Sequence, residues 1–194
     1  MNTIDTLRAE PVLTADRVVA AWAGARPLVR RALVAACAVA AVLSAVMPAS
    51  PAVRWGIAVA GVLLAVAAMV DVHEHRLPNR LLAAALLASS VAAVSSLHRE
   101  VVLSMVAGAL VAGVPMLLVR LTRGVGMGDV KMAAVIGANV GAVSVVAAPV
   151  AIAIAALTAG LYGLLADRRR VALGPALWFG WAASLAGCAA GWLS

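Results

Sequence analysis

Asp71 and Asp129 are the residues of this chain most suited to chemistry, because each places a carboxylate beside a long apolar run. Of the eight acidic residues, only these two adjoin such a run and also stand next to a turn-forming sequence. An ionised carboxylate near hydrocarbon costs roughly 2.5–3.5 kcal/mol on insertion scales, so it is rare without a role. Asp167 also ends an apolar run, but three arginines follow it, and we interpret it as a loop residue.

Each of the two aspartates also has a plain structural interpretation. Asp71 alone fits a helix end at the level of lipid headgroups, and Asp129 alone fits a helix cap after a glycine-rich loop. Together they predict a dyad, since aspartic proteases hydrolyse peptides with two carboxylates that share one proton. The negative end of a helix at Asp71 and the positive end of another at Asp129 then predict that Asp71 carries the proton and Asp129 is ionised.

The rest of the chain is too apolar for a soluble domain. Hydrophobic residues make up 65% of it and charged residues 12%, against about 45–50% and roughly 25% in soluble proteins. The apolar residues form runs of about 17–20, the length of a membrane-crossing helix. The net charge of +7 is assigned to cytoplasmic loops rather than to nucleic-acid binding, because no basic stripe is interleaved with aromatic residues. The predicted class is an all-α, polytopic transmembrane helical bundle.

The apolar runs predict about seven membrane helices. They cover about 32–47, 53–70, 81–97, 101–121, two short spans within 130–166, and 173–193. We expect the break in the long stretch at 139–141, where turn formers stand. The predicted organisation is a cytoplasmic N-terminal segment (1–30) with an amphipathic helix over 13–25, an extra N-terminal transmembrane helix (31–52), and the main membrane domain (53–194).

The distribution of basic residues predicts the orientation. With the N-terminus in the cytoplasm, thirteen Lys and Arg residues fall on the cytoplasmic side, and only Arg54 and Arg99 fall on the outer side. Such a bias is typical of proteins that follow the positive-inside rule. It places Asp71 and Asp129 at the same, cytoplasmic face of an inner (cytoplasmic) membrane.

The sequences around the two aspartates carry two motifs in a fixed order. Asp71 is followed by Arg76, Leu77, Pro78 and Asn79, while Asp129 is preceded by Gly126 and Gly128 and followed by Lys131. These motifs resemble those of the GxGD aspartic membrane proteases, specifically the prepilin and preflagellin peptidase family in its short, peptidase-only form. Gly174-Pro175 is similar to the Gly-Pro element that opens the last helix of family members. The resemblance covers about residues 53–193.

The resemblance implies an aspartic endopeptidase that removes the leader peptide from precursors of type IV pilins at the cytoplasmic face. Asp71 and Asp129 are then the catalytic residues, and no cofactor or metal is required. The expected partners are a prepilin-like substrate with a hydrophobic N-terminal helix and membrane lipid, with no nucleic acid. The chain has no CxxC pair, so the methyltransferase activity of the large bifunctional members is not expected.

The remaining motif residues are expected to support substrate binding or the conformation of the two motifs. They are Arg76, Pro78, Asn79, Gly126, Gly128 and Lys131. Glycines permit close backbone approach and unusual dihedral angles. Pro78 is expected to fix a turn, and Asn79 to cap the third helix. A water-accessible cleft between the second, fourth and fifth helices would admit the water that hydrolysis needs.

Two other interpretations stay open. Intramembrane acids beside glycine-broken helices also mark ion pathways, so a proton-coupled transporter is the alternative function. The sequence His73-Glu74-His75 has metal-ligand residue types, but positions i and i+2 do not share a helix face. We interpret it as a loop or a substrate contact. Cys37 and Cys188 lie within apolar runs and are interpreted as small helix residues.

Overall fold

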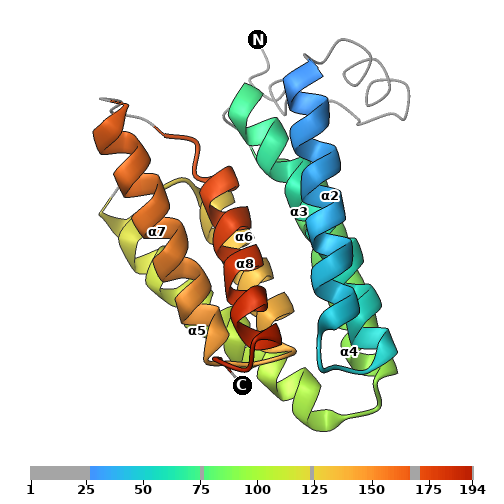
Figure 1. Ribbon diagram of the computed structural model, residues 1–194. Helices are drawn as coiled ribbons and strands as arrows, with labels where there is room; N and C mark the ends of the chain where they lie inside the picture. Colours follow the sequence, from blue (N-terminus) through green and yellow to red (C-terminus); the bar gives the residue numbers. More distant parts are fainter. Residues whose placement is uncertain (1–26, 75–76, 123–124, 167–170, 194) are drawn as a thin grey trace, which may run out of the picture. The chain divides into compact units, whose positions relative to one another are not determined.

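The computed structural model describes residues 27–74, 77–122, 125–166 and 171–193, apart from the side chains of Leu28, His73 and Glu74. All regular secondary structure within these ranges is helical (Figure 1). The helices are α2 (Pro27–Val46), α3 (Pro51–Glu74), α4 (Asn79–Ser95), α5 (Arg99–Leu121), α6 (Met127–Gly141), α7 (Ala147–Leu165) and α8 (Gly174–Ala189). The predicted all-α class with about seven helices is confirmed. The amphipathic helix expected over 13–25 lies outside the described residues.

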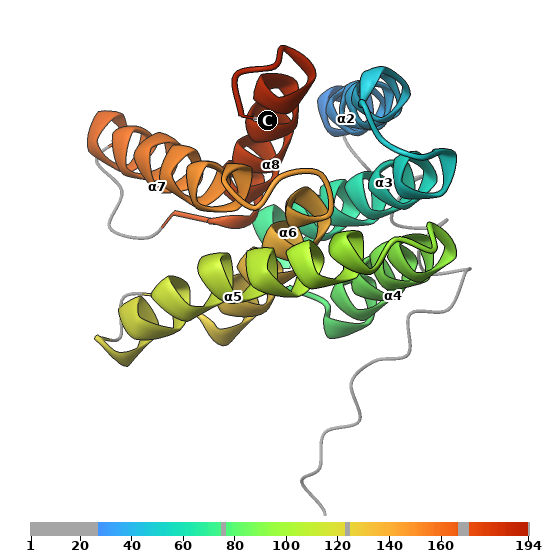
Figure 2. The same cartoon turned by 90° about the horizontal axis from the view of Figure 1, so that it is seen from below.

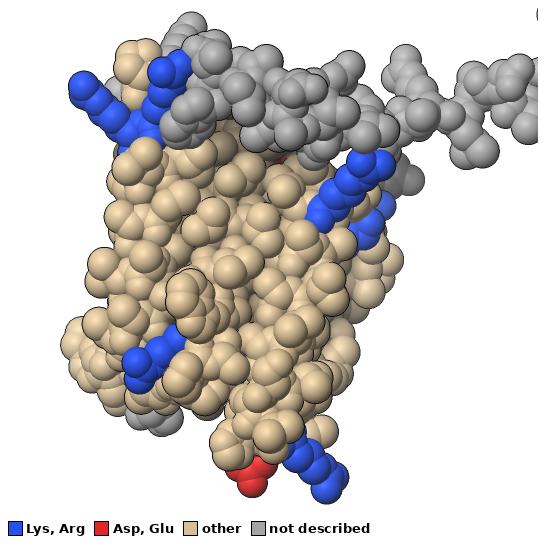
Figure 3. Space-filling model, turned by 90° about the vertical axis from the view of Figure 1, so that its right-hand side faces the viewer, with Lys and Arg blue, Asp and Glu red and all other residues tan. Residues whose placement is uncertain are grey.

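Four of these helices have the length and composition of a full membrane span. They are α2, α3, α5 and α7, and they make the chain a multi-pass membrane protein. Helices α4, α6 and α8 are shorter, with 17, 15 and 16 residues. On the face drawn in Figure 3, Lys and Arg side chains lie toward the edges and leave a broad uncharged area between them. Such an uncharged surface is compatible with contact with lipid chains.

The break between α6 and α7 falls at residues 142–146, just after the predicted position at 139–141. Gly137 and Gly141 both lie in α6 and serve helix packing. A Cβ added at Gly137 would lie 2.3 Å from the carbonyl oxygen of Gly108 on α5, and one at Gly141 would lie 2.6 Å from the carbonyl oxygen of Ser104. The absence of side chains lets the backbones of α5 and α6 touch, as small residues do in membrane helix pairs.

Helix α6 lies at the centre of the compact unit Leu33–Ser194. It packs against α3, α4, α5, α7 and α8, and Figure 2 shows it enclosed by these helices. Every residue from Val135 to Gly141 is buried. A short helix surrounded by protein needs no lipid-facing length of its own, which accounts for its 15 residues. The buried end of α6 therefore has a fixed position among these helices.

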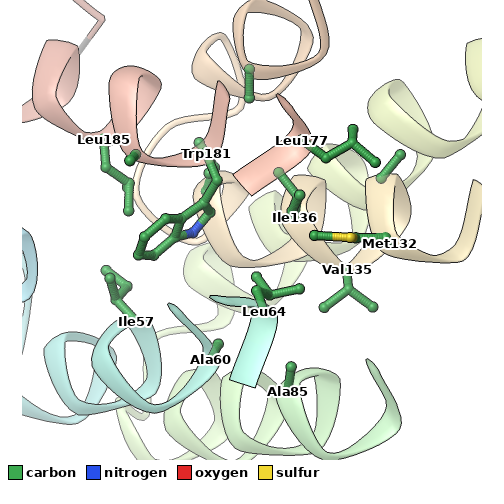
Figure 4. Packing of buried hydrophobic residues seen from close by; sticks show 14 of the residues in the cluster. Ile57, Ala60, Leu64, Ala85, Met132, Val135, Ile136, Leu177, Trp181 and Leu185 are labelled. Carbon is green, nitrogen blue, oxygen red and sulfur yellow. The ribbon is translucent and has the colours of Figure 1, made fainter. Parts of the chain in front are cut away.

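Trp181 is the largest side chain in the core and is fully buried (Figure 4). Its indole Nε1–H donates a hydrogen bond of 2.7 Å to Oδ1 of Asn139. The Asn139 amide donates one of 2.9 Å to Oγ of Ser89, which donates to the Ala85 carbonyl at 3.0 Å. Buried polar groups are stable when each has a partner, so this chain of hydrogen bonds fixes α8, α6 and α4 to one another.

Candidate active site

Asp71 lies near the end of α3 and has only 6% of its surface exposed. Its Oδ2 atom accepts a hydrogen bond of 3.0 Å from the backbone N–H of Gly174. Gly174 is the first residue of α8, so the start of one helix meets the end of another. Asp71 is not the last residue of α3, because the helix continues past it to Glu74.

Asp129 lies in the first turn of α6 and is half-buried. Its Oδ2 atom accepts a hydrogen bond of 3.1 Å from the backbone N–H of Gly126, the residue that caps the helix. The helix-start position predicted from the sequence is thus observed, although the capping residue itself is Gly126. The neighbouring Met127 is exposed, so this end of α6 reaches the surface.

The two carboxylates interact, although they are 58 residues apart in the sequence. Asp129 lies outside the four helices of full span length. Burial raises the pKa of Asp129 above its ordinary value, and the negative charge of Asp71 raises it further. The N–H of Gly126 opposes these two effects without cancelling them. Two nearby carboxylates with one raised pKa form the electrostatic pattern of a shared proton.

The raised pKa of Asp129 disagrees with the expectation that Asp129 is ionised and Asp71 protonated. That expectation considered the helix ends alone. A favourable helix terminus contributes about 0.3–1 kcal/mol, whereas desolvation of a carboxylate can outweigh it. Here loss of solvent is the largest cause of the raised pKa of Asp129, and it stabilises the neutral form relative to a solvated aspartate.

Lys131 and Asn79 join the two motifs. The Lys131 ammonium donates a hydrogen bond of 2.9 Å to Oδ1 of Asn79, and both residues are exposed. The prediction that Asn79 caps the third helix is wrong. Asn79 is the first residue inside α4, the capping position belongs to Pro78 in extended conformation, and no side chain caps the helix. The amide oxygen accepts from Lys131 on the neighbouring helix instead.

Gly126 and Gly128 are needed for space rather than for unusual dihedral angles. In the described part of the chain, the glycine with positive φ is Gly191. A Cβ at Gly128 would lie 3.0 Å from Cβ of Leu77, and one at Gly126 would lie 3.1 Å from Oδ2 of Asp129. The first motif therefore packs through Leu77 against the second, which brings the backbones that carry both aspartates together.

Some of the predicted site lies beyond what the structure describes. Arg76, Gly124 and His75 fall outside the described residues, as do the side chains of His73 and Glu74. No group of three metal-ligating side chains is present among the residues that are described. The cleft expected between α3, α5 and α6 remains a prediction.

The contact between Gly174 and Asp71 was missed by sequence reasoning. Gly174-Pro175 was noted as a motif, but no sequence signal connects a backbone N–H with a carboxylate 103 residues earlier. The only hint in the sequence was that a helix starting with Gly-Pro has a first N–H that needs a partner outside the helix.

Comparison with known proteins agrees with the two-motif pattern. No curated protein and no solved structure matches the chain. The profile of the type IV leader peptidase family matches residues 58–164, a range that holds Asp71, Asp129 and both surrounding motifs. It ends before α8 and begins after α2. Since the match spans more than half of the chain, this protein belongs to the type IV leader peptidase family.

Proposed function

We propose that this protein is an intramembrane aspartic endopeptidase that cleaves the leader peptide from type IV prepilin-like precursors at the cytoplasmic membrane face. One observation carries the proposal. Asp71 on α3 and Asp129 on α6 lie close enough for the charge of one to raise the pKa of the other. The family match supports the peptidase class.

The proposed reaction needs only the two carboxyl groups and water. The ionised carboxylate takes a proton from the water as its oxygen bonds to the scissile carbonyl carbon. The protonated partner gives its proton to the carbonyl oxygen, which forms a gem-diol. The first carboxyl then passes its proton to the leaving nitrogen as the C–N bond breaks, and one hydroxyl proton of the gem-diol returns to the second carboxylate.

The proposed substrate has a short leader followed by a hydrophobic helix. The broad uncharged surface between the basic edges in Figure 3 is compatible with such a helix lying in the bilayer. The excess of basic residues in the predicted cytoplasmic loops supports a cytoplasmic position for the dyad. Without CxxC pairs, the proposed activity ends with cleavage and does not include methylation of the new N-terminus.

The test is cleavage of a purified prepilin-like precursor by the purified protein in nanodiscs. Asp71→Asn and Asp129→Asn should each abolish cleavage while the protein stays folded. Glu100→Gln is the matched control, because Glu100 is an exposed acid in the first turn of α5, at the helix end remote from α6's start. Near wild-type cleavage by either aspartate variant would refute the two-aspartate mechanism.

A further inference from the structure

The start of α8 meets Asp71 through a single backbone group. Gly174 is buried, and its N–H points at Oδ2 of Asp71 across 3.0 Å. As the first helical residue, Gly174 has an N–H without a partner inside α8. The next residue, Pro175, brings no N–H at all. Gly174 lies beyond the range that the family profile matches, so its position comes from the structure.

A side chain at position 174 would crowd Asp71 and Ala68. A Cβ there would lie 2.9 Å from Oδ2 of Asp71, 3.1 Å from Cβ of Asp71 and 3.1 Å from Cα of Ala68. Two of these three neighbours belong to the backbone or its first attached carbon, which cannot rotate away. Even a methyl group would therefore push the carboxylate or separate α8 from α3.

The two carboxyl groups of the proposed dyad, Asp71 and Asp129, have different surroundings. The start of α8 supplies an N–H donor and the positive end of a helix, and both favour a negative charge. The other carboxyl of the proposed dyad, Asp129 of α6, has a pKa that is raised by burial and by the negative charge of Asp71. Two residues further along α6, the Lys131 ammonium is bonded to Asn79 of α4. No titratable side chain occurs in α8 before Cys188.

We propose that Gly174 is a positioning residue that holds Asp71 as the ionised partner of the dyad, so that Asp71 is the general base and Asp129 the general acid. This inference rests on the proposed function. The bond to Oδ2 leaves Oδ1 of Asp71 to take the proton of the attacking water. Asp129 then supplies the proton that the carbonyl oxygen receives.

The first test is Gly174→Ala, measured by cleavage kinetics across pH. The kcat should fall about 10- to 100-fold, the range expected when a hydrogen bond to a charged group is lost. The KM should change little, because no substrate contact is removed. Displacement of the Asp71 carboxylate from this N–H by the added Cβ should also move the acidic limb of the kcat/KM profile to higher pH. A packing defect alone would not move that limb.

Gly180→Ala is the matched control on the same helix. A Cβ at Gly180 would lie 2.1 Å from the carbonyl oxygen of Ala151, a tighter clash that is remote from Asp71. This variant should lose thermal stability. The acidic limb of the kcat/KM profile of its folded fraction should stay at the wild-type pH.

A second variant removes the donor without adding an atom. Glycolic acid in place of Gly174, introduced by cell-free translation into nanodiscs, turns the N–H into an ester oxygen. It should reproduce the lower kcat and the shifted limb. Wild-type kcat with an unmoved limb in this ester variant would overturn the role of Gly174 and leave the dyad standing. Activity in Asp71→Asn would instead refute the proposed function itself.

Discussion

Lys131 on α6 donates a hydrogen bond of 2.9 Å to the side-chain oxygen of Asn79 at the start of α4. The bond joins the two halves of the candidate active site at its exposed rim, beside the half-buried Asp129. It also fixes the position of a positive charge two residues from a carboxylate.

Removal of this bond should loosen the site rather than abolish its chemistry. Lys131→Met and Asn79→Ala should each lower kcat/KM by up to about tenfold, since an exposed charged hydrogen bond contributes about 1 kcal/mol. The kcat/KM of the double variant should be no lower than that of the less active single variant, because the two changes remove one interaction. Arg80→Met, which removes another exposed cation of α4, is the control. Additive losses would show that the two residues act separately.

The raised pKa of Asp129 predicts a pH dependence of stability. Burial and the charge of Asp71 raise this pKa above 3.8, so the native state holds a proton more tightly than the unfolded chain. The stabilisation is full below the unfolded value and is lost as the pH rises through the raised value. The thermal midpoint in nanodiscs should therefore fall from acid toward neutral pH. In Asp129→Asn this fall should be smaller, and in Glu100→Gln it should equal that of the wild type. Equal slopes in Asp129→Asn and the wild type would contradict the raised pKa.

Cleavage should be sensitive to the size of the side chain at position 128. Gly128→Ala places a Cβ 3.0 Å from Cβ of Leu77 and should separate the two motifs, with a loss of cleavage of about tenfold or more. In the double variant Gly128→Ala/Leu77→Ala, the shorter side chain at 77 still has its Cβ. The second change should therefore restore activity only in part. Gly160→Ala is the control, because nothing lies within 4 Å of a Cβ at that position. Full activity in Gly128→Ala would mean that the motifs do not need this contact.

The α5–α6 backbone contact predicts a different phenotype. Gly137→Ala would place a Cβ 2.3 Å from the carbonyl oxygen of Gly108, and no side-chain rotation can relieve that overlap. The variant should lose about 1–3 kcal/mol of stability, as overpacked sites do. Measured as thermal midpoint and folded yield, the loss should exceed that of Gly160→Ala. Cleavage per folded molecule should change less than stability does.

Helix number, helix type and the pairing of the two aspartates were predictable because they depend on local signals. Apolar run length set the helices, and the motifs around Asp71 and Asp129 had recognisable residue types. The roles of individual polar groups were not predictable. Asn79 was assigned as a cap from its preference for that position, yet its oxygen accepts from Lys131, 52 residues later.

The same limit applied to Asn139, whose turn preference suggested a break. Inside the folded chain, the Trp181 indole and the Ser89 hydroxyl are its partners, and a buried amide with two partners is stable within a helix. Such long-range contacts depend on the packing of all the helices. A single sequence shows which groups need a partner but not which partner they find.

The shortness of α6 and α8 couples the site to the thickness of the bilayer. Their 15 and 16 residues correspond to about 22 and 24 Å, against roughly 30 Å of hydrocarbon in an ordinary membrane. Because α6 is enclosed by other helices, we expect water rather than thinned lipid to make up the difference beside the starts of the two helices, where Asp129 and Gly174 lie. The length of the lipid acyl chains should therefore affect the hydration of Asp129, whose pKa is already raised by burial.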